Sequence, residues 1–213
     1  MSNGDVLELL CARGVVPVVI ADGLDLLRPL GDALKNGGLP IAEMTFRTPT
    51  AIEALRLLAL DPDLLVGAGT ILRPEQVDLA HAAGARFIVT PGFSSRVVDR
   101  CRELGLPVVP GVTTATDLIA ALDHGIELVK FFPAEASGGI ATVRALHGPF
   151  PEVRFIPTGG ISATNAADYL ALRSVAAVGG SWMVSPALLR SRDFAGITRL
   201  AAETVELAAQ ARP

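Results

Sequence analysis

The sequence predicts an α/β fold, a single (β/α)8 barrel with a short N-terminal helix that covers residues 1–213 as one domain. Three observations support this prediction. Apolar segments of strand length alternate with helical segments eight times, at intervals of roughly 20 to 27 residues. The strand segments are apolar throughout, as in a parallel sheet covered by helices on both faces. Polar residues and glycines gather directly after the strands, where this fold builds its active sites.

The elements follow one another without a linker or a low-complexity segment. A short helix is expected at residues 3–13. The expected strands are residues 15–20, 39–46, 64–68, 87–90, 107–110, 126–132, 153–157 and 175–178. The first two strands are followed by helices with apolar stripes at Leu27, Leu30 and Leu34 and at Ile52, Leu55 and Leu58, the second helix beginning at Thr48 and Pro49. Later helices are expected at 74–83, 94–104, 114–123, 138–146, 163–172 and about 193–209.

Composition excludes several classes of function. The net charge is −4 at pH 7 and the sequence holds no Lys/Arg cluster, so nucleic acid and anionic membranes are not expected as partners. Residues 1–10 do not resemble a signal peptide, and no uncharged apolar run is long enough to span a membrane. Cys11 and Cys101 are far apart and are expected to be reduced apolar residues of a cytoplasmic protein.

Lys130 lies in the middle of an apolar, aromatic strand bounded by Gly125 and Pro133. The chain contains two lysines, Lys35 and Lys130, against sixteen arginines. Arginine keeps its proton in proteins, whereas a desolvated lysine can become a neutral amine nucleophile. Lys130 is therefore a candidate for covalent chemistry. The alternative interpretation is a strand lysine whose ammonium group reaches solvent.

Glu43 is a carboxylate within the second apolar strand. Burying a carboxylate is costly unless it is paired or hydrogen-bonded. Strand alternation places Glu43, Thr45 and Arg47 on one side, with Arg47 just above the barrel mouth. Glu43 is thus a candidate general acid–base group. The alternative is an internal Glu43–Arg47 salt bridge with no catalytic role.

Two glycine groups follow the last two strands, Thr158-Gly159-Gly160 and Gly179-Gly180-Ser181. Loops at these positions of the fold frequently bind phosphate through backbone N–H groups and a helix N-terminus. Ser162 is expected to cap the following helix. The three histidines fall at helix ends, so the sequence holds no His/Cys cluster and a metal-dependent mechanism is disfavoured.

Seven stretches resemble the 2-keto-3-deoxy-6-phosphogluconate (KDPG) aldolase family, whose members also act as 4-hydroxy-2-oxoglutarate (KHG) aldolases and are class I pyruvate aldolases. They run in the family's order over nearly the whole chain. The lysine stretch and the two glycine stretches are the most specific. The stretches are residues 43–48 (EMTFRT), 66–70 (VGAGT), 91–92 (PG), 109–111 (VPG), 130–135 (KFFPAE), 157–161 (PTGGI) and 179–182 (GGSW).

The resemblance implies that Lys130 forms a Schiff base with the substrate's keto carbon and that Glu43 is the general acid–base. It also implies a binding role for nine further residues. Arg47 and Thr70 would hold the pyruvate carboxylate, Pro91 and Phe132 would line the pocket, Thr158 would meet a substrate hydroxyl, and Gly159, Gly160, Gly180 and Ser181 would bind the phosphate. No metal and no cofactor beyond the covalent imine on Lys130 would be needed.

The implied reaction is cleavage of KDPG, a 2-keto-3-deoxy sugar acid phosphate of the Entner–Doudoroff pathway, to pyruvate and glyceraldehyde 3-phosphate. Cleavage of KHG to pyruvate and glyoxylate is also implied, as are a homotrimer and a cytoplasmic location. Three alternatives are kept open: an aldolase for the galactonate epimer, a barrel that binds sugar phosphate without turnover, and a divalent-metal aldolase. Thr158 favours the gluconate epimer, and the missing ligand cluster argues against the metal enzyme.

Overall fold

The computed structural model describes residues 3–21 and 23–212, and every strand pairing in this part of the chain is parallel. The strands are β1 (Val15–Val19), β2 (Ile41–Thr45), β3 (Leu65–Gly69), β4 (Ile88–Val89), β5 (Val108–Val109), β6 (Gly111–Val112), β7 (Leu128–Phe131), β8 (Arg154–Pro157) and β9 (Val178–Gly180).

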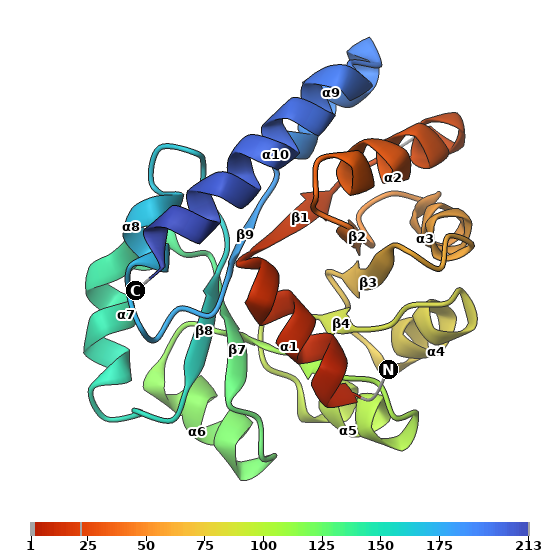
Figure 1. Ribbon diagram of the computed structural model, residues 1–213. Helices are drawn as coiled ribbons and strands as arrows, with labels where there is room; N and C mark the ends of the chain where they lie inside the picture. The colour runs from red at the N-terminus through yellow and green to blue at the C-terminus, as the bar shows by residue number, and fades with distance from the viewer. Residues whose placement is uncertain (1–2, 22, 213) are drawn as a thin grey trace.

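Helices alternate with the strands and surround them (Figure 1). The α-helices are α1 (Asn3–Arg13), α2 (Leu27–Asn36), α3 (Ala51–Ala59), α4 (Pro74–Ala82), α5 (Ser95–Glu103), α6 (Ala115–Asp123), α7 (Gly139–His147), α8 (Ala166–Leu170), α9 (Pro186–Ser191) and α10 (Phe194–Ala211). Three short 3-10 helices complete the set: η1 (Leu24–Leu26), η2 (Glu135–Ser137) and η3 (Trp182–Val184).

The strands form a curled parallel sheet in two sections. One section has the order β5-β4-β3-β2-β1-β9 and the other the order β6-β7-β8. Pro110 alone separates β5 from β6. Isolated bridges join Phe155 to Val175 and Thr158 to Gly179, which brings the end of β8 beside the segment that carries β9.

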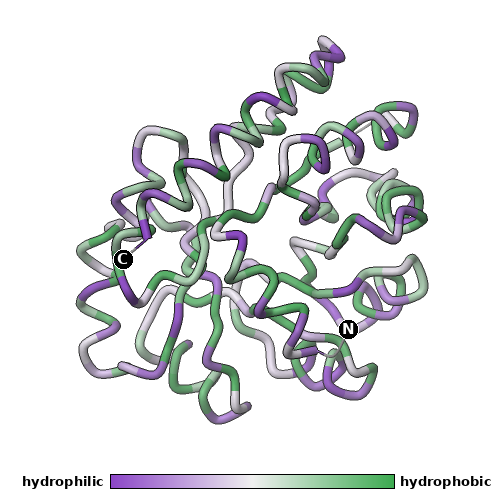
Figure 2. The backbone as a smooth tube through the Cα atoms, in the orientation of Figure 1, coloured by the Kyte–Doolittle hydropathy of each residue, from purple (hydrophilic) through white to green (hydrophobic). Residues whose placement is uncertain are grey.

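The apolar side chains fall into two clusters, one on each side of the sheet. Ile41 and Leu128 belong to the inner cluster, whereas Met44 and Val129 belong to the outer cluster under the helices. Because strand side chains alternate between faces, Glu43 points inward with Ile41, and Lys130 points inward with Leu128. In Figure 2 the strands in the middle are mostly green or white, whereas the surrounding helices carry both green and purple stretches.

Helix α1 covers the end of the sheet where the strands begin (Figure 1). Its Val6 and Leu10 are 2% and 1% exposed and belong to the inner cluster. Their neighbours there include Val16, Ile41 and Leu128, which stand in the first half of their strands. The carboxyl ends of the strands, which carry the polar loops, lie at the opposite end.

The structure confirms the order of the expected elements and corrects several boundaries. The fifth strand is divided because Pro110 has no N–H to donate to a ladder. Helix α3 begins at Ala51, not at Thr48 and Pro49, since the Thr48 hydroxyl donates to the Ala21 carbonyl at 3.3 Å. The eighth strand is expected at 175–178 but β9 runs over Val178–Gly180.

Two further corrections concern helices near the C-terminus. Ser162 does not cap α8, which begins after Asn165; the Asn165 Oδ1 accepts a hydrogen bond from the Ser162 N–H at 2.8 Å. Helix α9 is absent from the sequence prediction. Its start has two common features of a helix N-terminus: Ser185 accepts a hydrogen bond from the Leu188 N–H, and Pro186 occupies the first turn.

Candidate active site

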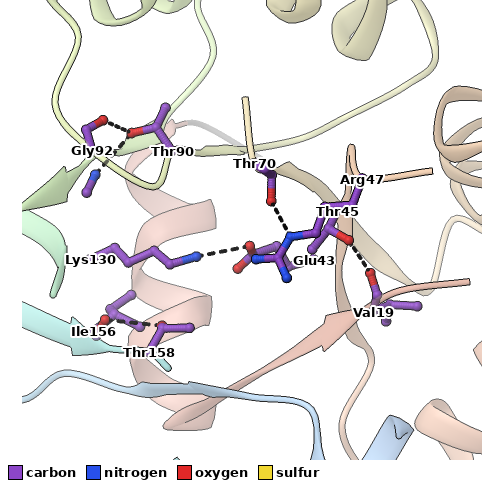
Figure 3. A network of polar contacts seen from close by, with 11 residues as sticks. Val19, Glu43, Thr45, Arg47, Thr70, Thr90, Gly92, Lys130, Ile156 and Thr158 are labelled. Carbon is purple, nitrogen blue, oxygen red and sulfur yellow. Dashed lines mark hydrogen bonds and ion pairs between the residues drawn. The ribbon is translucent and has the colours of Figure 1, made fainter. Parts of the chain in front are cut away.

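Lys130 and Glu43 meet inside the sheet (Figure 3). The Lys130 Nζ donates a hydrogen bond to the Glu43 Oε1 at 3.3 Å, and the two residues are 87 positions apart in the chain. Their side chains are only 5% and 3% exposed. Each charge thus offsets part of the cost of burying the other, and removal of either would leave an unpaired buried charge.

Glycines on the neighbouring strands allow close packing beside this pair. Glu43 is the register partner of Gly67 on β3, and Lys130 is the partner of Gly111 on β6. A Cβ on Gly69 would lie 2.2 Å from the Glu43 Oε1, so the carboxylate rests directly over the Gly69 backbone. A Cβ on Gly111 would lie 2.2 Å from the Pro91 carbonyl carbon. These glycines therefore permit close approach of groups that a larger residue would exclude.

Aromatic and apolar groups complete the surroundings of Lys130. Its Nζ lies 5.3 Å from the centroid of the Phe132 ring, within the range of a cation–π contact. Thr158, 7% exposed, directly follows β8, the strand that pairs with the strand of Lys130. A small cavity under the pair is lined by Leu10, Val16, Glu43, Phe87, Val89, Val109, Lys130, Ile156 and Thr158. The amine is thus shielded from bulk water on its inner side.

Arg47 and Thr70 lie together at the mouth of the sheet (Figure 3). The Arg47 Nε donates to the Thr70 Oγ1 at 3.2 Å. Thr70 has a φ of 60°, a left-handed conformation that a β-branched residue adopts at a cost of about 1 to 2 kcal/mol. Among the described residues, Glu43 forms its ion pair with Lys130 and none with Arg47, so the alternative of an internal Glu43–Arg47 salt bridge is wrong.

Thr90 holds the Pro91–Gly92 loop beside the strand that pairs with Lys130. Its hydroxyl donates to the Gly92 carbonyl at 2.7 Å and accepts from the Gly111 N–H at 3.0 Å (Figure 3). The sequence places Thr90, Pro91 and Gly92 together after a strand, but only Pro91 is expected to have a role in the site. The sequence indicates this role of Thr90 only weakly, because its hydrogen-bond partner Gly111 on β6 is 21 residues away.

The two glycine groups also come together. The isolated bridge between Thr158 and Gly179 places them on adjacent segments. Gly159 and Gly160 have φ values of 98° and 81°, which L-residues with side chains rarely adopt. A Cβ on Gly180 would lie 1.9 Å from the Trp182 ring, whose Nε1 donates to Thr204 on α10 at 3.1 Å. Ser181 is exposed at the start of η3.

Other kinds of site find no support in the described ranges 3–21 and 23–212. There, no three His, Cys, Asp or Glu side chains come together in a group that could hold a metal ion. Within the same ranges no helix combines the length and the apolar character that crossing a bilayer requires.

A buried amine that can pass its proton to a neighbouring carboxylate meets the requirement for imine formation at a carbonyl, the chemistry of class I aldolases, which are carbon–carbon lyases. The family model described as KDPG and KHG aldolase matches residues 6–200. The chain therefore belongs to the KDPG and KHG aldolase family.

Individual relatives agree with this assignment. The 2-dehydro-3-deoxy-phosphogluconate aldolase of Haemophilus influenzae is 44% identical over 203 residues, covering 95% of this chain and 96% of the relative. The KHG/KDPG aldolase of Escherichia coli K12 is 43% identical over 200 residues, covering 93% and 94%.

Among solved structures, the KDPG aldolase of Legionella pneumophila is 40% identical, with a TM-score of 0.91 and coverage of 96% of this chain and 98% of that one. It holds pyruvate captured at low pH as a covalent carbinolamine intermediate. A structure described as native KDPGal is less similar, at 26% identity and a TM-score of 0.83, with coverage of 92% and 95%.

Proposed function

We propose that this enzyme cleaves KDPG to pyruvate and glyceraldehyde 3-phosphate, and KHG to pyruvate and glyoxylate. The observation that carries the proposal is the buried Lys130–Glu43 pair at 3.3 Å. The names of the relatives at 43–44% identity support the substrate. The lower similarity to the KDPGal structure favours the gluconate over the galactonate epimer, and the ratio of turnover for the two epimers tests this preference.

The pair accounts for both halves of the chemistry. Transfer of a proton from the Lys130 Nζ to Glu43 leaves a neutral amine, which adds to the substrate's keto carbon and gives a carbinolamine. Glu43 then returns the proton to the carbinolamine hydroxyl, which leaves as water and gives the protonated imine. Cleavage of the carbon–carbon bond sends its electron pair into the imine and leaves an enamine. Glu43 takes the proton of the hydroxyl that becomes the aldehyde and later protonates the enamine carbon. Water releases pyruvate and restores Lys130.

Substrate binding follows from the residues around the pair. Arg47 and Thr70 hold the pyruvate carboxylate, supported by their contact at the mouth. Pro91 and Phe132 form the pocket walls, and Thr158 meets a substrate hydroxyl. The phosphate binds to the glycine loops, through Gly159 and Gly160 on one side and Gly180 and Ser181 on the other.

We also propose that residues 1–213 form one domain whose strands close into a (β/α)8 barrel. The bridges between β8 and the β9 segment support closure on one side, and the single residue between β5 and β6 supports it on the other. A homotrimer and a cytoplasmic location are proposed from the family resemblance. Sedimentation equilibrium at several concentrations tests the trimer, and a species of one or two chains would contradict it.

The proposed function is tested by trapping the imine. The enzyme is incubated with pyruvate and sodium borohydride, and the intact mass and peptide map are measured. We expect a reduced pyruvyl adduct on the peptide that contains Lys130. Lys130→Arg is the control, since it keeps the charge and cannot form the imine; it should show neither adduct nor turnover. An adduct confined to Lys35, or activity in Lys130→Arg, would contradict the mechanism.

A further inference from the structure

The Glu135 side chain lies directly against the Gly159–Gly160 loop. A Cβ on Gly160 would be 2.5 Å from the Glu135 Cγ and 2.7 Å from its Cβ, so the side-chain stem of Glu135 occupies that space. Glu135 begins η2, which follows β7. The segment that carries Lys130 thus continues into a wall of the neighbouring glycine loop.

Tyr169 anchors the Glu135 carboxylate from behind. This residue, the single tyrosine of the chain, is fully buried on α8 and donates its hydroxyl hydrogen to the Glu135 Oε1. Burial, and after it the Glu135 carboxylate, raises the pKa of the Tyr169 hydroxyl above its usual value. The hydroxyl therefore stays protonated and remains a donor at any pH at which an aldolase works.

The backbone of the loop is held in one orientation by its carbonyl groups. The Thr158 carbonyl accepts from the Ala134 N–H at 2.8 Å, and the Gly159 carbonyl accepts from the Glu135 N–H at 3.1 Å. The Gly160 carbonyl accepts from the Asn165 Nδ2 at 3.1 Å. Among the described residues, no backbone carbonyl accepts a hydrogen bond from the Gly159 N–H or the Gly160 N–H. Backbone N–H groups at a glycine turn that have no backbone acceptor are available to bind an anion.

We propose that Glu135, anchored by the Tyr169 hydroxyl, is a positioning residue that keeps the Gly159–Gly160 loop ready to bind phosphate and thereby sets the preference for phosphorylated over unphosphorylated substrates. The inference rests on the proposed function. Glu135 acts through the loop and not as a ligand, because its carboxylate would repel a phosphate. Its effect should therefore appear with KDPG and be absent with KHG, which carries no phosphate.

The test compares KM and kcat for KDPG and KHG in four variants. Glu135→Ala removes the stem and the acceptor, and should raise the KM for KDPG about tenfold with kcat nearly unchanged. Tyr169→Phe keeps the ring and removes the anchor, and should raise it about threefold. Glu135→Gln keeps both stem and acceptor and should stay within about twofold of the parent enzyme. Glu152→Ala, an exposed glutamate before β8, is the matched control and should change neither substrate. All four should cleave KHG with kcat/KM within about twofold of the parent.

The outcomes separate the inference from the proposed function. An equal loss on both substrates in Glu135→Ala would overturn the inference, as would a lower KM for KDPG in Glu135→Gln, which would indicate charge repulsion alone. Thermal unfolding would show whether Tyr169→Phe is folded. Glu135 is exposed, so the two Glu135 variants should fold and still test the inference if Tyr169→Phe does not. A parent enzyme that cleaves neither substrate would overturn the proposed function itself, whatever the variants do.

Discussion

Lys130 and Glu43 each explain the burial of the other. Burying a charged lysine or glutamate without a partner has a large desolvation cost. The attraction between the two charges, at 3.3 Å, offsets part of that cost. The sequence pointed to both residues because each interrupts an apolar strand. It did not indicate which partner Glu43 would take, since strand alternation fitted Arg47 equally well. The choice of partner is settled by the curvature of the sheet, which brings β2 and β7 face to face.

Replacing Glu43 by glutamine tests its role as a proton carrier. Glu43→Gln keeps the size of the side chain and one oxygen acceptor for the Lys130 Nζ but cannot accept or return a proton. We expect kcat for KDPG cleavage to fall by about 10²- to 10⁴-fold. Circular dichroism should show an unchanged fold. A kcat within threefold of the parent would mean that another group moves the proton.

Cys101 should make stability depend on pH in the alkaline range. Burial raises the pKa of its thiol from 9.0 to about 12. The folded state holds the proton more tightly than the unfolded state, so the stabilisation is complete below pH 9 and is lost as the pH rises towards 12. The slope is at most about 1.4 kcal/mol per pH unit.

The measurement is urea unfolding at several pH values between 8 and 11 for the parent and Cys101→Ala. At pH 8 the variant should be less stable, because it loses buried volume, and the difference should shrink as the pH rises. The informative quantity is the slope of unfolding free energy against pH, which should be less steep in the variant. Two parallel curves would contradict the prediction.

At the scale of elements, glycines in the strands determine how closely the site is packed. Gly69 and Gly111 both lack room for a Cβ, but for different reasons. Gly69 faces the flexible end of Glu43, whereas Gly111 faces the backbone of the Pro91–Gly92 loop. A side chain can move aside where a backbone cannot, so the two positions should respond differently to the same substitution.

The prediction is that Gly69→Ala displaces the Glu43 carboxylate and lowers kcat by about 10- to 100-fold, with a smaller fall in melting temperature than in Gly111→Ala. Gly111→Ala, the comparison variant, should lower the melting temperature by several degrees because the loop must shift. Differential scanning calorimetry and steady-state kinetics on both proteins provide the check. A strongly destabilised Gly69→Ala with normal specific activity would contradict this assignment.

Helix α1 should contribute measurably to stability through Leu10. This residue is 1% exposed and belongs to the inner cluster. We expect Leu10→Ala to lower the free energy of unfolding by about 2 to 4 kcal/mol. Glu8→Ala, an exposed position on the same helix, should change it by less than about 0.5 kcal/mol. Equal effects from the two variants in urea titrations would show that α1 does not pack as described.

The elements that the sequence predicted well are those with strong apolar patterns, such as β2, β7 and α10. Its errors have local causes that lie outside such patterns. Pro110 breaks a strand whose neighbours remain apolar, and Thr48 looks like a cap but bonds to the Ala21 carbonyl instead. The Glu135–Tyr169 contact spans 34 residues and depends on how α8 packs, so spacing alone could not indicate it.

At the scale of the whole molecule, catalysis should need no metal ion. The residues proposed to carry the reaction are an amine and a carboxylate, which complete the chemistry without a Lewis acid. We expect dialysis against EDTA to leave the rate of KDPG cleavage unchanged, and added Mg²⁺, Mn²⁺ or Zn²⁺ not to raise it. Loss of activity with the chelator and its return with one of these ions would instead favour a divalent-metal aldolase.

The two sections of the sheet have one further consequence. Glu43 belongs to the six-stranded section and Lys130 to the three-stranded one, so neither section contains a working site by itself. During refolding, enzymatic turnover should consequently return only when the sections have joined, later than circular dichroism reports helices. The time course of regained activity therefore measures the rate of the last long-range step of folding in this chain.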